Sequence, residues 1–154
     1  MLEAERFMLE AIQEAKKAEN EVPVGAVIVK DGRIIARAHN ERETAGPLAH
    51  AEMLAIQRAF AALSARRLHG CTLYVTLEPC PMCAGGIIMA ELDACIYGAW
   101  DDKQGCCGSV YSLPEDPAFY HRVQCSGGVM EAECAGLLRD FFQKRREKIS
   151  DSIA

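Results

Sequence analysis

Three side chains in this sequence combine residue types and spacing that suit a transition metal. Cys80 and Cys83 lie within the segment Pro-Cys-Pro-Met-Cys, and His50 opens the earlier segment His-Ala-Glu. Cysteines at i and i+3 on the first turn of a helix lie on one face and can bind one ion. Thiolates together with an imidazole favour zinc. The three side chains therefore predict a zinc site, provided that the fold brings them together.

The number of ligands separates a structural zinc site from a catalytic one. A structural site uses four protein ligands, whereas a catalytic site uses three and keeps one position for water. The sequence has no second Cys-x-x-Cys pair or Cys/His pair at a matching spacing. We therefore expect water in the fourth position and Glu52, two residues after His50, as the proton shuttle. Such a site would direct an activated water at a polarised carbon of a flat heterocycle.

The residues alone leave other interpretations open. One of the remaining cysteines could supply a fourth ligand, which would make the zinc structural and the chain an RNA-binding or interaction module. A Cys-x-x-Cys pair between a strand and a helix also suits thiol–disulfide exchange, but His50 and Glu52 would then have no role. Glu78, which precedes a proline at the end of an extended segment, is expected to form a structural salt bridge.

The composition predicts one globular domain, residues 1–154. Of these residues 50% are hydrophobic and 25% are charged, which suits a single buried core. The net charge of −5 argues against nonspecific coating of nucleic acid, although the basic segment 144–148 could form a local patch. The amphipathic start is unlike a signal peptide, and no apolar run reaches membrane-spanning length. With eight cysteines expected to be reduced, we predict a cytoplasmic protein without membrane contact.

Hydrophobic periodicity and turn residues predict the elements that must position the chemistry. Helices are expected at about 2–18, 51–63, 81–92 and 131–148, and strands on both sides of Asp31-Gly32, at 71–77, at 94–99 and, weakly, at 121–125. The segment 41–50 is expected to be a loop. The order of these elements predicts a three-layer α/β/α domain with a mixed five-stranded central sheet.

Beyond the zinc ligands, longer segments resemble the bacterial tRNA-specific adenosine deaminases. The signatures H-x-E and P-C-x-x-C are shared by zinc nucleobase deaminases, tRNA adenosine deaminases among them. The resembling segments cover most of the chain and include EVPVGAVIV, AHAE, TLYVTLEPCPMCAGGII, YGAWDDKQGCCGS and GGVMEAECAGLLRDFFQKRR. Within these segments, DDKQG and FFQKRR are similar to the tRNA enzymes in particular.

The resemblance implies a cytidine deaminase-like fold that converts adenosine to inosine by hydrolysis at the wobble position of a tRNA anticodon. It also implies one zinc ion per subunit, held by His50, Cys80 and Cys83, with Glu52 as the general acid and base. Asn40 would hydrogen-bond the target nucleoside, and the side chains around the RNA groove would be Asp101, Lys103, Phe141, Phe142 and Arg145. The helix 131–148 would form part of the RNA-contacting surface. The implied partners are an anticodon stem-loop and a second copy of the chain, because members of the family pair as homodimers.

The zinc signature by itself also suits a deaminase of a free base or nucleoside, such as guanine or cytidine. The DDKQG segment and the basic tail argue against this alternative. Some residues depart from the family pattern, namely Trp100, Asp102, the pair Cys106-Cys107, and Tyr120-His121 in place of Asn-His. These departures leave the zinc chemistry unchanged and affect the expected contacts with RNA.

Overall fold

The computed structural model describes residues 1–153, which form one mixed sheet flanked by helices. In chain order the elements are α1 (Glu3–Ala15), β1 (Gly25–Lys30), β2 (Arg33–His39), α2 (Arg42–Ala45), α3 (Ala51–Leu63), β3 (Cys71–Leu77), α4 (Pro81–Ala90), β4 (Ala94–Ala99), β5 (Gln124–Ser126) and α5 (Glu131–Ile153). The strand order is β2-β1-β3-β4-β5. β1 is antiparallel to both β2 and β3, whereas β3, β4 and β5 run parallel. The predicted mixed five-stranded sheet is confirmed.

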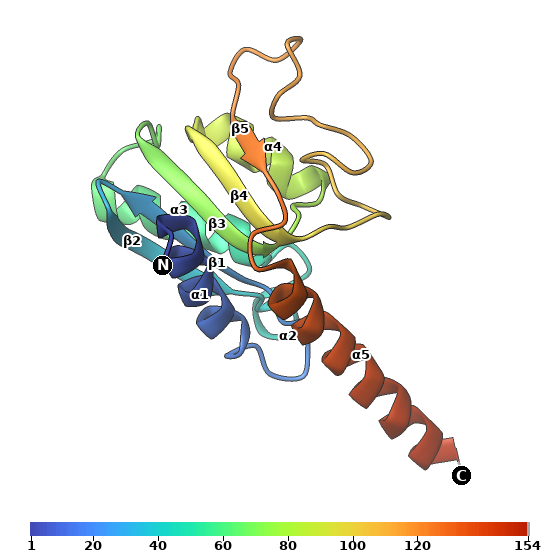
Figure 1. Cartoon of the computed structure of the whole chain (residues 1–154). Helices are drawn as coiled ribbons and strands as arrows, with labels where there is room; N and C mark the ends of the chain where they lie inside the picture. The colour runs from blue at the N-terminus through green and yellow to red at the C-terminus, as the bar shows by residue number, and fades with distance from the viewer. Residues whose placement is uncertain (154) are drawn as a thin grey trace.

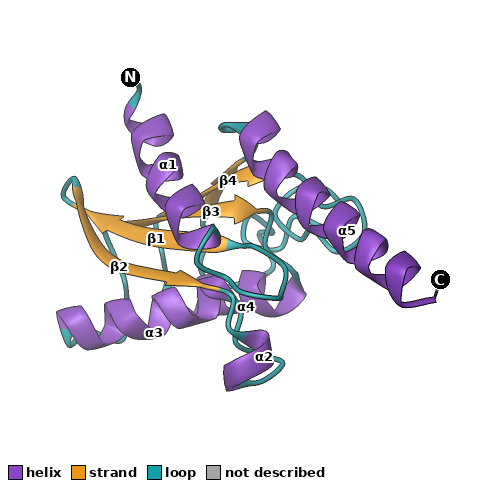
Figure 2. Cartoon of the chain, turned by 90° about the horizontal axis from the view of Figure 1, so that it is seen from below, coloured by secondary structure: helices purple, strands orange, loops and turns teal. Residues whose placement is uncertain are grey.

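The helices cover the two faces of this sheet and complete the three predicted layers. Figure 2 shows α1 and α5 on one side of the sheet, with α3 and α4 on the other. Both faces of β1 are buried. Ala26 and Ile28 pack in the core under α3 and α4, whereas Val27 and Val29 pack in the core under α1. A strand covered on both faces reads as a continuous apolar run, as this one does.

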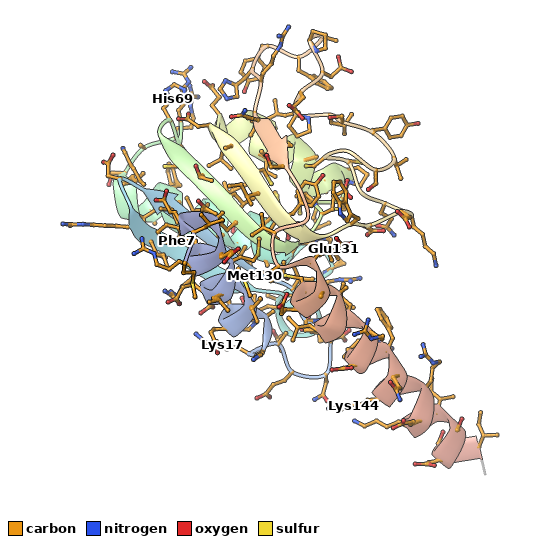
Figure 3. The ribbon with its side chains drawn as sticks, viewed as in Figure 1. Phe7, Lys17, His69, Met130, Glu131 and Lys144 are labelled. Atoms are coloured by element: carbon orange, nitrogen blue, oxygen red, sulfur yellow. The ribbon has the colours of Figure 1, made fainter. Side chains whose placement is uncertain are left out.

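The α1 side of the sheet is held by aromatic and aliphatic contacts. Phe7, labelled in Figure 3, packs on Tyr74 of β3 with 5.3 Å between the ring centroids. Met8 and Ala11 are completely buried in the same layer. These contacts fix α1 across the strands that lead to the candidate site.

The turn between β1 and β2 follows directly from its sequence. Asp31 and Gly32 both have positive φ, at 51° and 74°, which matches the twist of a two-residue hairpin loop. Lys30 and Arg33 close the loop as the last paired residues. The two strands therefore return His39 and the following Asn40 to the end of the sheet where β1 begins.

Five elements differ from those expected. α4 ends at Ala90 rather than near 92, and β5 spans Gln124–Ser126 rather than 121–125. The segment 41–50 is not all loop, because Glu21 accepts hydrogen bonds from the backbone N–H groups of Arg42 and Glu43 and so stabilises the short helix α2. α1 ends at Ala15 rather than near residue 18. α5 continues to Ile153, beyond the expected end at 148. Figure 1 shows the outer part of α5 running away from the body of the protein.

Within residues 1–153, no helix combines the length and the apolar character that crossing a lipid bilayer requires.

The close packing of α1 on β1 depends on a residue without a side chain. A Cβ atom at Gly25 would overlap the carbonyl oxygen of Ala11 and the backbone of Ala15. Because helix backbone cannot shift as a flexible side chain can, we expect Gly25→Ala to lower the free energy of unfolding by about 3 kcal/mol or more. Chemical denaturation followed by circular dichroism measures this loss.

Gly136→Ala is the matched control for that substitution. Its added Cβ would lie 3.5 Å from the guanidinium of Arg139, an ordinary contact in the interior of α5. Replacing a helical glycine with alanine stabilises a protein by roughly 0.5–1 kcal/mol. Equal stability of the two variants would contradict the proposed tight contact between α1 and β1.

Candidate active site

Two helices begin beside one another with residues that do not cap them. His50 is the N-cap of α3 and Cys80 is the N-cap of α4, and both have extended backbone. Neither side chain makes the capping hydrogen bond that Ser, Thr, Asp or Asn would make there. Pro81 follows Cys80 at the first helical position, where its missing N–H removes one unsatisfied donor. The imidazole and the thiol are therefore free to bind another group.

The distances between these side chains suit one zinc ion. Nδ1 of His50 lies 3.7 Å from Sγ of Cys80 and 3.6 Å from Sγ of Cys83. A tetrahedral zinc with bonds of about 2.3 Å to sulfur and 2.0–2.1 Å to nitrogen would place N and S about 3.6 Å apart. Within residues 1–153, the group of possible ligand atoms lying within 4.8 Å of one another contains only these three side chains. The geometry fits a zinc ion with three protein ligands.

A hydrogen bond couples the protonation of the two cysteines. A hydrogen bond from the Cys83 thiol is the main cause that lowers the pKa of Cys80 to about 4. A hydrogen bond with His50 lowers this pKa further, whereas the burial of Cys80 acts in the opposite direction. The hydrogen bond between the two cysteines and the burial of Cys83 raise the pKa of Cys83 well above its usual value. The bond to Cys80 also raises the pKa of His50. Because metal ligands must lose their protons, binding at this site would weaken as the pH falls.

Glu52 lies in the first turn of α3, close to the metal ligands. Its side chain is only 4% exposed, and this burial is the main cause that raises the pKa of Glu52 to about 7. The negative charge of the Cys80 thiolate raises the pKa of Glu52 further. A carboxyl group with a pKa near neutrality can both accept and return a proton under physiological conditions. The environment of Glu52 thus suits the role of proton shuttle.

Asn40 supplies the cap that His50 does not. Its Oδ1 accepts a 2.9 Å hydrogen bond from the backbone N–H of Ala51, the first residue of α3. Its Nδ2 donates to the carbonyl of Val22 at 3.1 Å. An amide side chain has four hydrogen-bonding sites, so two remain for another partner. Sequence reasoning expected Asn40 at the substrate and missed this positioning of the helix that carries His50 and Glu52.

A cavity of about 480 Å³ opens beside the candidate zinc site. Its lining residues come from both helix starts, the segment before β1, the loop after β4 and the near part of α5: Val22, Val24, Asn40, Arg42, His50, Glu52, Leu77, Glu78, Cys80, Trp100, Asp101, Asp102, Lys103, Gln104, Leu138 and Phe142. Its volume is in the range of small-molecule sites. The cavity is large enough to admit a nucleobase next to Glu52.

Most of the expected site residues meet at this cavity, and three do not line it. Cys83 is completely buried behind it. Phe141, between the lining residues Leu138 and Phe142, and Arg145, further along α5, are outside the lining. Phe141 packs edge-on against Phe142 with 5.2 Å between centroids, and the Arg145 guanidinium lies 5.9 Å from the centroid of the Phe141 ring. Of the aromatic pair, only Phe142 reaches the cavity.

Several lining residues were not assigned to the site from the sequence. Trp100, which is 45% exposed, stands at the cavity and packs edge-on against Tyr97 at 5.1 Å. Its departure from the family pattern was the one signal that marked this position. Arg42 lies in a segment with no motif, and Val22 lies in the segment EVPVGAVIV, to which no site role was assigned, so only the fold places them at the cavity.

Comparisons with known proteins agree with this geometry. Residues 1–99 match the family described as the cytidine and deoxycytidylate deaminase zinc-binding region. The tRNA-specific adenosine deaminase of Bacillus subtilis (strain 168) is 52% identical over 151 residues, which cover 96% of this chain and 94% of the relative. The tRNA-specific adenosine deaminase of Aquifex aeolicus (strain VF5) is 45% identical over 148 residues, with 94% and 97% coverage.

Solved structures show the same fold. A structure from studies of A-to-I editing by tRNA:A34 deaminases at the wobble position of transfer RNA has a TM-score of 0.82 and 44% identity, covering 86% of this chain and 99% of that one. A guanine deaminase from Bacillus subtilis has a TM-score of 0.60 and 45% identity, with coverage of 62% and 64%. The fold is therefore cytidine deaminase-like, as expected. The chain belongs to the cytidine and deoxycytidylate deaminase family and, within that family, to the tRNA-specific adenosine deaminases.

Proposed function

We propose that this protein converts adenosine to inosine at the wobble position of a tRNA anticodon by hydrolytic deamination. The observation that carries the proposal is the buried Glu52 beside the His50, Cys80 and Cys83 cluster, at the wall of a cavity of base size. The similarity to tRNA-specific adenosine deaminases over nearly the whole chain supports the choice of substrate. We also propose that residues 1–154 act as one domain in the cytoplasm, where the eight free cysteines would stay reduced.

In this proposal His50, Cys80 and Cys83 hold the zinc ion, and Glu52 moves the protons. When bound, zinc supplies the activation that lets water attack the ring carbon carrying the amino group. Glu52 accepts a proton from that water and delivers it to the adjacent ring nitrogen. It then passes the second proton to the leaving nitrogen, so water and adenosine become inosine and ammonia. Because the carboxyl group of Glu52 is buried beside the proposed zinc ligands, one side chain can perform both transfers.

The target base must leave its stack to reach this cavity. The side chain of Asn40 retains two unused hydrogen-bonding sites and lines the cavity, so it can hydrogen-bond the nucleoside. Trp100 and Phe142 offer aromatic faces at the same cavity. Single-stranded RNA is commonly recognised by stacking on aromatic rings with cations nearby. Asp101 and Lys103 would meet the flanking nucleotides.

The outer part of α5 would extend the RNA surface beyond the cavity. α5 reaches the cavity through Leu138 and Phe142 and then runs outward, with Lys144 on the projecting part in Figure 3. Lys144, Arg145 and Arg146 are all exposed there. Their charges can neutralise phosphates of the stem while the loop enters the cavity.

We further propose that two copies pair through the exposed face of α3 and α4. Phe60, Met89 and Tyr120 are 52%, 74% and 70% exposed, and they line a second cavity of about 670 Å³. Arg67 and Glu91 at the same cavity pair with each other at 3.1 Å, so they add no net charge to the patch. In a two-fold interface the same patch meets itself, and an apolar patch can pack against its own copy.

The catalytic role is tested by Glu52→Gln. The amide keeps the shape of the side chain but cannot carry protons, so we expect full zinc content and a kcat lower by roughly 10²–10⁴-fold or more. The substrate is an anticodon stem-loop with adenosine at the wobble position. Cys83→Ala is the matched variant, and it should lose both zinc and turnover. Wild-type turnover by Glu52→Gln would refute the assignment, and deamination of free guanine or cytidine alone would refute the substrate.

The role of α5 is tested by the triple variant Lys144→Ala, Arg145→Ala, Arg146→Ala. We expect a higher KM for the stem-loop, an unchanged kcat, and a salt dependence of binding that is shallower by roughly 1 in slope for each phosphate contact removed. Arg33→Ala is the control, because the register of β1 places Arg33 at the end of the sheet away from Leu77 and Cys80. An identical salt slope in the triple variant and the wild type would exclude α5 from RNA binding.

The pairing surface is tested by Met89→Glu, at a side chain that is 74% exposed. A charge at the centre of an apolar interface is strongly unfavourable when buried. We expect light scattering to report a monomer for this variant and a dimer for the wild type. Ile149→Glu on α5, where the side chain is 52% exposed, should leave the dimer intact. A wild-type monomer, or a dimer that survives Met89→Glu, would contradict this surface.

A further inference from the structure

Glu78 is a buried carboxylate that the proposed chemistry does not use. Its side chain is 2% exposed. Among residues 1–153 it takes part in no salt bridge, so the ion pair expected from the sequence is wrong. Its Oε1 instead accepts hydrogen bonds from the N–H of Asp101 at 3.0 Å and from the hydroxyl of Ser109. Its Oε2 accepts from the N–H groups of Cys107 at 3.2 Å and Ser109 at 2.8 Å.

These four bonds explain how a carboxylate without a cation can be buried here. Burying a charge is unfavourable unless hydrogen bonds replace its water. A carboxylate has about four lone-pair sites, and all four are matched by donors from the loop after β4. The same bonds satisfy three backbone N–H groups that the loop cannot pair within itself. The buried carboxylate of Glu78 and the conformation of the loop 101–109 therefore depend on each other.

The backbone around Glu78 is also held, by the end of β4 and by the loop. The N–H of Glu78 donates to the carbonyl of Ala99 at 2.9 Å, and the carbonyl of Pro79 accepts from the N–H of Cys106 at 2.8 Å. Gly105 lies so close that a Cβ atom there would overlap the Glu78 carboxylate. The loop thus packs directly against the segment that leads into the metal ligand Cys80.

The part of the loop nearest the cavity has its own turn, built on the same anchor. Oδ1 of Asp101 accepts from the backbone N–H groups of Lys103 at 3.0 Å and Gln104 at 3.1 Å. Asp101, Lys103 and Gln104 all line the cavity, together with Asp102. The backbone of Asp101 is in turn held by Glu78. One wall of the cavity therefore rests on a single buried side chain.

We infer that Glu78 is a positioning residue for substrate binding, which holds the loop 101–109 as the wall of the base cavity. The inference rests on the proposed function for its substrate. When the carboxylate is lost, the loop samples other conformations and the binding-competent fraction of the protein falls. The apparent affinity for the RNA falls by the same fraction. None of the four bonds involves Glu52 or a proposed zinc ligand, so we expect zinc content and kcat to change much less than KM.

Glu78→Gln tests this inference on the zinc-loaded protein. The amide nitrogen cannot accept a hydrogen bond, so two loop donors lose their partner. We expect KM for the anticodon stem-loop to rise roughly tenfold or more, with kcat changed much less and zinc content unchanged. Hydrogen exchange at the amides of Asp101, Cys107 and Ser109 should accelerate by a similar factor. Val27→Ala is the control for general destabilisation, because it truncates a buried side chain under α1, and it should leave KM and these three amides unchanged.

The outcomes separate the inference from the proposed function. An unchanged KM in Glu78→Gln, with an active wild type, would overturn the inference and leave the deaminase function standing. A fall in kcat or in zinc content with KM unchanged would also overturn it, since Glu78 would then act on the metal centre. A wild type inactive on the stem-loop would refute the proposed function. In that case the exchange of the three amides still decides whether Glu78 holds the loop.

Discussion

The site depends on two helices that begin against each other without side-chain caps. His50 and Cys80 occupy the N-cap positions of α3 and α4, where Ser, Thr, Asp or Asn would stabilise the helices more. Other residues take over this role. Asn40, just after β2, accepts a hydrogen bond from the first N–H of α3, and Pro81 lacks the N–H that would otherwise be unsatisfied at the start of α4. The sheet brings both starts to one edge. The same arrangement places positive helix ends beside thiolates, which they stabilise.

Buried polar side chains divide into two groups around the cavity. Glu21 and Glu78 are surrounded by backbone N–H donors of neighbouring loops and hold those loops in place. Glu52 is equally buried, but burial dominates its environment and raises its pKa to about 7. Carboxylates in different environments can thus take different roles within one site. The three carboxylates are similarly buried, so the number of N–H donors around each one, and not its exposed fraction, separates those that hold loops from the proposed proton shuttle.

The sequence predicted those features that local patterns encode. Strands 71–77 and 94–99 and helix 51–63 have the expected bounds, because apolar runs and breaking residues mark them. The proposed zinc ligands Cys80 and Cys83 stood out because a spacing of three places them on one face of a helix. The roles of Asn40 and Glu78, and the helix α2 stabilised by Glu21, were missed because each depends on a hydrogen bond between segments far apart in the sequence. Such bonds produce no periodic pattern of residue types in the sequence.

The projecting half of α5 has a thermodynamic consequence for any partner that it meets. A helix of 23 residues is about 34 Å long, and every side chain from Phe142 to Ile153 is exposed. Helical segments without tertiary packing are marginal in water, so the rest of the protein contributes little to the stability of this arm. A partner that aligns along it must offset, through its own contacts, the free energy lost when the arm is ordered. Each extra turn would lengthen the reach of the arm and add to that cost.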